Sequence, residues 1–144
     1  MLGDISGLTV LDAFSGSGAL AFEAYSRGAK EITAIELDKG AYDTIRHNIE
    51  SLGLQDKVIL TRANVTSWAN RNKHRSFDLV FADPPYEAIN YFFLKKLARV
   101  TKKGGIIVFS MPVDSDFTLA EHEFTLLAYK KYAGATLAFY KAIG

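Results

Sequence analysis

The stretch LTVLDAFSGSGALAFEAYSRGA, residues 8–29, carries the strongest structural signal in the chain. Residues 8–14 are mostly apolar and predict a short buried strand. A glycine-rich turn follows, and after it comes a run with the apolar spacing of a helix that ends near Gly28. A strand that leads through glycines into a helix is the opening of a βαβ unit, which is typical of nucleotide-binding α/β folds.

The rest of the chain continues this alternation of strand and helix. The patterns predict strands at residues 31–38, 57–63, 77–83 and 104–111, and helices at residues 39–54, 64–73 and 88–100. The final segment is typical of a β-hairpin that turns at Gly134. Because such alternation forms parallel sheets with right-handed crossovers, we expect one α/β, Rossmann-like domain over residues 1–144. Its sheet is mostly parallel, with helices on both faces and a C-terminal antiparallel hairpin.

Composition excludes several classes of protein. Hydrophobic residues make up 49% of the 144 residues, which is enough for a domain with its own core. No apolar run approaches the roughly 20 residues of a membrane helix, and the N-terminus lacks the pattern of a signal peptide. The absence of cysteine excludes disulfides and fits a cytoplasmic protein, and the histidines lack metal-ligand spacing. We therefore expect a cytoplasmic monomer that needs no metal.

The glycine turn predicts a site for a nucleoside-containing cofactor. Gly16, Gly18 and Ala21 match the pattern G-x-G-x-x-G/A, in which small residues let the backbone approach a ligand and let the helix pack on the sheet. Glu36 ends the second predicted strand, at the distance along the chain where an acid meets a ribose hydroxyl pair. A plain tight turn is the alternative interpretation of the glycines.

The charge near this turn indicates which cofactor it holds. Asp12 ends the first predicted strand, and an anion there would repel the pyrophosphate of a dinucleotide such as NAD. The same anion would attract S-adenosylmethionine, which carries an ammonium and a sulfonium. Asp12 could instead be a turn-stabilising acid. Asn64 and the backbone of Val65 follow the third strand and could contact the adenine, although Asn64 also suits a helix N-cap.

A second motif, ADPPYE at residues 82–87, follows the fourth predicted strand. Asp83 and the carbonyl group of Pro84 offer two hydrogen-bond acceptors to a planar amine, and Tyr86 could stack on its ring. Pro84 and Pro85 have a fixed φ and no N–H, so they stiffen the loop without a competing donor. The motif predicts methyl transfer to the amine of an unstacked base, with a capping turn as the alternative.

The stretches LDAFSGSGALAFEAYSRGA, IELDKGAYDTIRHNI and FDLVFADPPY resemble the bacterial small-subunit ribosomal RNA guanine-N2 methyltransferases. The resemblance implies a seven-stranded sheet whose last strand is antiparallel, and methylation of guanine N2 in 16S ribosomal RNA, alone or in a ribosomal subunit. It places Asp12, Gly16 and Gly18 at the methionine end of S-adenosylmethionine, Glu36 at the ribose and residues 83–86 at the base. The predicted cofactor site also includes Phe14, Ser15 and Leu37.

The sequence departs from this family at two places. Asn64 stands where many relatives carry an acid. Relatives also usually have a segment before the first strand, and because that strand starts near Leu8 we expect the given sequence to lack it. Four alternatives stay open: a DNA adenine or cytosine amino-methyltransferase, a protein glutamine methyltransferase, an NAD-dependent enzyme and a non-catalytic cofactor-binding module. The basic connection at residues 70–76 could contact RNA phosphates, although we interpret it mainly as a solvated loop.

Overall fold

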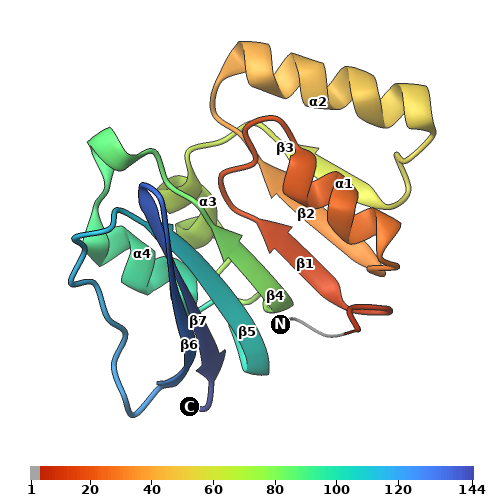
Figure 1. The fold of residues 1–144 in the computed structure, drawn as a ribbon. Helices are drawn as coiled ribbons and strands as arrows, with labels where there is room; N and C mark the ends of the chain where they lie inside the picture. The colour runs from red at the N-terminus through yellow and green to blue at the C-terminus, as the bar shows by residue number, and fades with distance from the viewer. Residues whose placement is uncertain (1–3) are drawn as a thin grey trace.

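The computed structural model describes residues 4–144, so the first three residues of the predicted domain lie outside the described part. The strands and helices follow the predicted order (Figure 1). The strands are β1 (Thr9–Asp12), β2 (Glu31–Ile35), β3 (Val58–Thr61), β4 (Phe77–Ala82), β5 (Thr101–Met111), β6 (Phe124–Tyr132) and β7 (Ala135–Ala142). The helices are α1 (Ala19–Ser26), α2 (Lys39–Leu52), α3 (Val65–Arg71) and α4 (Tyr91–Ala98), with a short 3-10 turn at Tyr86–Ala88.

All seven strands form one sheet in the order β3-β2-β1-β4-β5-β7-β6. Strands β1 to β5 pair in parallel, and β7 is antiparallel to both β5 and β6. These pairings confirm the predicted sheet, including its antiparallel last strand. The strand order reverses at β1, whose other neighbour is β4, with Asp12 beside Phe81. The glycine turn and the ADPPYE loop therefore leave the sheet side by side, where ligands bind in open α/β sheets.

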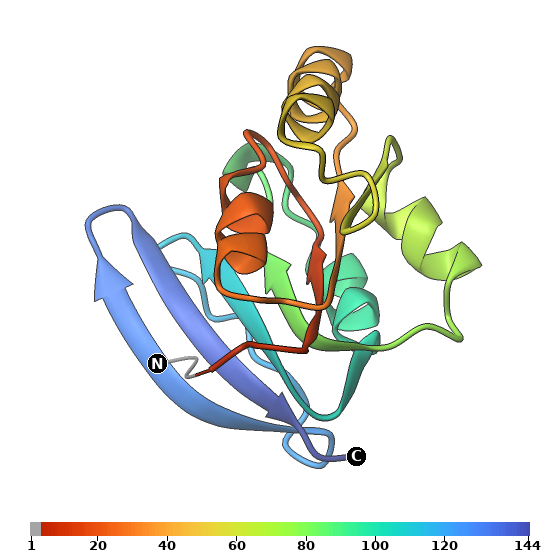
Figure 2. The same cartoon turned by 90° about the vertical axis from the view of Figure 1, so that its right-hand side faces the viewer.

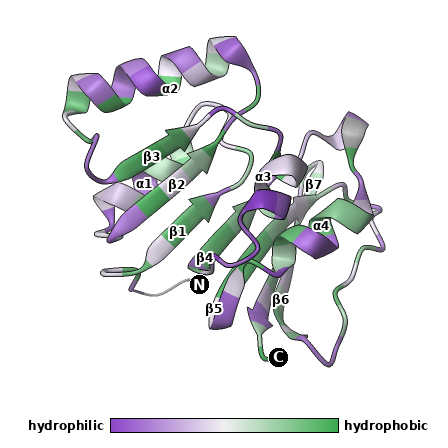
Figure 3. Cartoon of the chain, turned by 180° about the vertical axis from the view of Figure 1, so that it is seen from behind, coloured by the Kyte–Doolittle hydropathy of each residue, from purple (hydrophilic) through white to green (hydrophobic). Residues whose placement is uncertain are grey.

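Helices cover both faces of the sheet, as predicted. Helices α1 and α2 lie on one face, and α3 and α4 lie on the other (Figures 1 and 2). Because side chains alternate along a strand, β1 sends Val10 into the cluster with α1 and α2, and Leu11 into the cluster with α3 and α4. Apolar residues follow the inner strands in Figure 3, whereas α2 alternates polar and apolar positions. None of the helices within residues 4–144 is both long and apolar enough to cross a membrane.

Several strands differ in length from the prediction: β1, β3 and β4 are shorter by one to three residues, and β2 and β5 differ for reasons that the structure shows. Strand β2 ends at Ile35 instead of residue 38, because Asp38 turns the chain and caps α2 by accepting a hydrogen bond from the Ala41 backbone N–H. Strand β5 begins at Thr101, earlier than predicted, and the pairing with β4 shifts register there. At Gly105 an added Cβ would lie 2.7 Å from the Asp78 carbonyl oxygen, so only glycine fits this close approach.

Candidate active site

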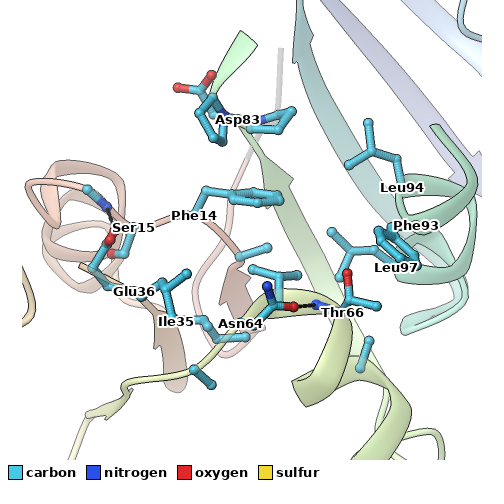
Figure 4. A pocket seen from close by; sticks show the side chains of 18 of the residues that line it. Phe14, Ser15, Ile35, Glu36, Asn64, Thr66, Asp83, Phe93, Leu94 and Leu97 are labelled. Atoms are coloured by element: carbon cyan, nitrogen blue, oxygen red, sulfur yellow. Dashed lines mark hydrogen bonds between the residues drawn. The ribbon is translucent and has the colours of Figure 1, made fainter. Parts of the chain in front are cut away.

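A cavity of about 800 Å³ lies beyond the carboxyl ends of the central strands (Figure 4). Most of the predicted site residues line it: Phe14, Ser15, Gly16, Glu36, Leu37, Asn64, Val65, Asp83, Pro84 and Pro85. Asp12, Gly18 and Tyr86 are not part of its lining. The sheet therefore brings the glycine turn, the acid after β2, the residues after β3 and the Asp-Pro-Pro loop to one place. The individual roles of these residues stay predictions.

Glu36 connects the glycine turn to the end of β2. Its Oε1 accepts a hydrogen bond of 2.6 Å from the Gly16 backbone N–H, and its Oε2 accepts one of 2.9 Å from that of Asp38. The Ser15 backbone N–H donates to the Ile35 carbonyl oxygen at 2.9 Å. These bonds fix the carboxylate at the edge of the cavity. Because each carboxylate oxygen has two lone pairs, Glu36 can still accept hydrogen bonds from a ligand.

Asp12 lies behind the wall of the cavity and is only 1% exposed. The Ser15 hydroxyl covers it and donates a hydrogen bond of 2.9 Å to Oδ2. Burial raises the pKa of Asp12 to about 6, because water no longer stabilises the charged form. The Ser15 hydrogen bond opposes this rise in pKa, whereas the negative charges of Asp83 and Glu36 add to it. Asp12 is therefore separated from the cavity by Ser15, and its role at the methionine end of the cofactor stays a prediction.

Gly18 serves the packing of α1. It is the residue before α1 and has φ +82°, in the left-handed region. An added Cβ would lie 2.9 Å from the Phe22 ring and 3.2 Å from the Ile45 side chain. Gly18 therefore lets α1 and α2 approach the turn closely. Gly16 differs, because it has φ +58° with open space around its Cα and lines the cavity.

Asn64 caps α3 and also borders the cavity. Its Oδ1 accepts hydrogen bonds from the backbone N–H groups of Thr66, at 2.9 Å, and Ser67, at 3.3 Å. The predicted N-cap role is therefore confirmed. In Figure 4 the amide nitrogen of Asn64 points away from Thr66, on the side where the cavity lies. The contact with adenine stays a prediction, and it is compatible with the cap.

The Asp-Pro-Pro loop begins where β4 ends. The Ala13 backbone N–H donates to the Phe81 carbonyl oxygen at 3.0 Å, which joins the loop to the glycine turn. Pro84 is buried, whereas the side chains of Asp83 and Pro85 are exposed. The Tyr86 hydroxyl lies 3.0 Å from the Ser110 hydroxyl oxygen. Tyr86 is therefore held against the end of β5, outside the lining of this cavity, and its stacking on the target base stays a prediction.

Helix α4 supplies a wall of the cavity, of which the sequence indicated only that some of the aromatic residues at 91–93 could border the base pocket. Phe93, Leu94 and Leu97 face the cavity opposite Ile35 and Glu36 (Figure 4). Asn90 and Lys96 also line it. The sequence contained a signal for this wall, because the apolar residues of α4 follow directly after the ADPPYE loop and so lie near the site.

The basic connection holds its own helix in place. The Arg75 guanidinium lies over the rings of Trp68, at 5.9 Å, and Phe77, at 5.0 Å, and it is 3.6 Å from a Glu31 carboxylate oxygen. Arg75 therefore makes contacts within the protein, which favours a structural role for this residue over contact with RNA phosphates. Within residues 4–144, no three His, Asp or Glu side chains gather as a metal site.

A family model described as Conserved hypothetical protein 95 matches residues 1–141. The chain belongs to this family. It is 38% identical over 76 residues to "Ribosomal RNA small subunit methyltransferase D" of Buchnera aphidicola, covering 53% of this chain and 39% of that protein. It is 32% identical over 80 residues to "tRNA1(Val) (adenine(37)-N6)-methyltransferase" of Shewanella halifaxensis, covering 56% of this chain and 32% of that protein. The chain thus spans well under half the length of these curated relatives.

Solved structures whose names read "putative methyltransferase" or "putative methylase" share the fold. The "putative methylase HI0767" of Haemophilus influenzae has a TM-score of 0.86 at 25% identity, with 97% of this chain and 89% of that chain covered. The "putative methyltransferase yhhF" of Escherichia coli has a TM-score of 0.87 at 24% identity, with 97% and 78% covered. A third neighbour, SMU.776, was solved with SAH bound and has a TM-score of 0.82 at 18% identity, with 97% and 46% covered. The predicted methyltransferase-type Rossmann fold is confirmed.

Proposed function

We propose that the chain transfers a methyl group from S-adenosylmethionine to the exocyclic amine of a nucleobase in RNA, with guanine N2 in 16S ribosomal RNA as the favoured target. One observation carries this proposal. Asp83 and the prolines after it border the same cavity as the glycine turn and Glu36. The proposed donor site and the proposed acceptor for an amine therefore share one cavity, and transfer between two bound groups requires them to be close together.

The cavity fits S-adenosylmethionine better than a dinucleotide. Glu36 keeps lone pairs for two ribose hydroxyls, and α4 and Ile35 offer an apolar wall to the adenine. The carboxylates of Glu36 and Asp83 lie close enough to Asp12 to add to the rise of its pKa. This group of acids would repel a pyrophosphate. S-adenosylmethionine supplies a methyl group on a cationic sulfur, which becomes a neutral thioether when the amine takes the methyl group.

The Asp83 carboxylate prepares the amine for this reaction. It accepts a hydrogen bond from an N–H of the amine. This bond orients the nitrogen lone pair and stabilises the positive charge that grows on the nitrogen. The same carboxylate receives the proton that the nitrogen loses and passes it to water. The carbonyl oxygen of Pro84 accepts a hydrogen bond from the second N–H of the amine. The two prolines have no backbone N–H that would compete with the amine for these acceptors.

The RNA target is supported by the similar proteins. One acts on small-subunit ribosomal RNA and another on adenine N6 of a tRNA, as their names state. Both names fit an exocyclic amine of an RNA base, so adenine N6 is the second candidate. The ribosomal subunit as partner and the monomeric state are part of the same proposal, because the chain matches only part of these relatives.

Labelled-methyl transfer tests the proposal. We expect the wild type to label ribosomal RNA, naked or in assembled subunits, and nuclease digestion to release a base methylated on its exocyclic amine. We expect Asp83→Ala to label RNA about a hundredfold more slowly, because it removes the acceptor. Calorimetry with S-adenosylmethionine tests whether the cofactor site of Asp83→Ala is intact. The affinity of this variant for S-adenosylmethionine should stay within about twofold of wild type, which is a difference in binding free energy of less than RT. Equal labelling by both proteins would refute the role of Asp83, and binding of NAD alone would refute the cofactor.

A further inference from the structure

The outer face of α4 carries an exposed aromatic ring beside cations. Phe92 is 62% exposed, which makes it the most exposed aromatic residue within residues 4–144. The Lys96 ammonium lies 4.7 Å from the centroid of the Phe92 ring. Arg99 follows Lys96 by three residues, so Phe92, Lys96 and Arg99 form one stripe at helical spacing. The buried residues of the helix lie on its other side: Leu94, Leu97 and Ala98.

The segment around this stripe is basic and contains no acid. The whole chain has 17 Lys and Arg and 16 Asp and Glu, yet residues 88–113 contain no aspartate or glutamate. The cations of this segment are Lys95, Lys96, Arg99, Lys102 and Lys103. Among residues 4–144, only Lys102 of these five has a carboxylate within 4 Å, that of Asp78. Because the chain as a whole has a formal charge of only +1, attraction for a polyanion must come from a local patch such as this one.

The helix dipole explains only part of this pattern. It favours cations near the C-terminus of α4, but it gives no reason for an exposed ring in the first turn. The neighbouring aromatic residues have partners, since the Tyr91 hydroxyl lies 3.3 Å from the Ser115 hydroxyl oxygen and Phe93 lines the cofactor cavity. Phe92 does not line that cavity, and its aromatic and cation contacts are with Phe93 and Lys96. Most of the Phe92 residue therefore faces solvent, where it can stack on a ligand.

The stripe begins beside the proposed reaction site. Phe93 and Lys96 line the cofactor cavity, and Figure 4 shows Phe93 on the side of α4 that faces it. Arg99 lies at the other end of the helix, close to where β4 and β5 begin. The seven residues from Phe92 to Arg99 extend about 10 Å along the helix axis. The stripe thus leads from the cavity along the face of the sheet that α3 and α4 cover, on the other side from α1 and Ile5.

We propose that the outer face of α4 binds the RNA strand that flanks the target base. Phe92 stacks on an unpaired base of this strand, and Lys96 and Arg99 contact its phosphates. A ring that stacks on bases, beside cations that contact phosphates, is how proteins hold unpaired strands. The inference rests on the proposed function and adds a contact with RNA outside the site of the reaction.

Helix α2 provides a matched control on the other face of the sheet. Leu52, at the end of α2, is 63% exposed, almost the same as Phe92. Lys57 lies shortly after it, is exposed, and has no carboxylate within 4 Å of its ammonium among residues 4–144. The double variants Phe92→Ala/Arg99→Gln and Leu52→Ala/Lys57→Gln therefore each remove one exposed apolar side chain and one cation. None of the four residues lines the cofactor cavity.

Fluorescence anisotropy with a labelled single-stranded RNA of mixed sequence, about 12 nucleotides long, tests the proposal. We expect Phe92→Ala/Arg99→Gln to bind this RNA on the order of tenfold more weakly. Its slope of log affinity against log salt should be smaller by about 0.7, because one phosphate contact is lost. Leu52→Ala/Lys57→Gln should stay within about twofold of wild type, as should Phe92→Tyr, which keeps the ring. Calorimetry should show the same affinity for S-adenosylmethionine in all four proteins.

Equal losses of RNA affinity in both double variants, or no loss in either, would overturn the assignment. Methylation of RNA by the wild type would then leave the proposed function standing. Self-association of the wild type in sedimentation, abolished by Phe92→Ala/Arg99→Gln with RNA affinity unchanged, would assign this face to a second copy of the chain instead. A wild type that binds S-adenosylmethionine and RNA no better than background would refute the proposed function and this inference with it.

Discussion

Asp12 is a carboxyl group whose protonation state depends on the fold. In the folded chain its pKa is about 6, above the value of 3.8 for an unperturbed aspartate. A raised pKa in the folded state means that the folded chain binds the proton more tightly than the unfolded chain does. The stabilisation is therefore complete below about pH 3.8 and is lost as the pH rises through about 6.

We expect Asp12→Asn to remove this pH dependence, because asparagine keeps the shape and an oxygen for the Ser15 hydroxyl but does not titrate. From pH 4.5 to 7.5, the free energy of unfolding of the wild type should fall relative to Asp12→Asn by about 2 kcal/mol. Urea unfolding of both proteins at the two pH values measures this difference. A difference of zero would show that Asp12 titrates normally in the folded chain.

Gly16 and Gly18 are expected to have different roles, since Gly16 lines the cavity and Gly18 allows close packing of α1 and α2. Gly16→Ala should lower the free energy of unfolding by about 1 kcal/mol, because only its left-handed φ opposes a side chain. Gly18→Ala should lower it by about 3 kcal/mol, because the new Cβ also meets Phe22 and Ile45. We expect Gly16→Ala alone to weaken S-adenosylmethionine binding beyond its effect on stability. Urea unfolding and calorimetry on the two variants check the order, and the reverse order of stability would contradict it.

At the scale of elements, α3 depends on its cap. Asn64→Ala leaves two backbone N–H groups of α3 without their acceptor, so we expect a loss of about 1 kcal/mol in the free energy of unfolding. Asn64→Asp keeps the acceptor and should stay within about 0.5 kcal/mol of wild type. Thermal unfolding of the three proteins at one pH measures this. A cost for Asn64→Asp as large as that for alanine would show that the amide nitrogen, not Oδ1, matters for stability.

The elements themselves were largely predictable from sequence, because helices and strands follow local patterns. In α2, for example, Ile45 and Ile49 are buried one turn apart, Asp38 caps the start and Gly53 ends the helix at φ +68°. The errors lie at boundaries that contacts between elements set. Strand β5 extends back to Thr101 because the opposite strand shifts register near Asp78, and no local pattern reports a partner's register.

At the scale of the whole molecule, the two faces of the sheet share their strands. Strand β4 sends Leu79 to the α1 side and Val80 to the α4 side, so neither cluster can form without the backbone of the other. We expect the chain to unfold in one cooperative transition.

The single tryptophan makes this expectation measurable. Trp68 is 3% exposed and lies in the α3–α4 cluster, so its fluorescence reports on one face, whereas far-ultraviolet circular dichroism reports on all elements. Urea midpoints from the two signals should coincide. Separate midpoints would show that the face covered by α3 and α4 unfolds independently of the other.

The residues of the candidate site could be found in the sequence because each sits in a local motif at the end of a strand. Strand order then places those ends together, and the pairing of β1 with β4 became known only from the structure. The local signals therefore predict the residues that carry the chemistry. They do not predict which way each side chain points once the chain leaves its strand.

Apolar spacing, glycine turns and caps are properties of neighbouring residues, so the primary structure alone sufficed for the order of elements and the fold class. The burial of Asp12 under Ser15, the α4 wall and the position of the exposed Asp83 at the rim of the cavity depend on packing between distant segments. Such packing follows from strand register and from which face each crossover helix covers, and neither is a property of a short stretch of chain.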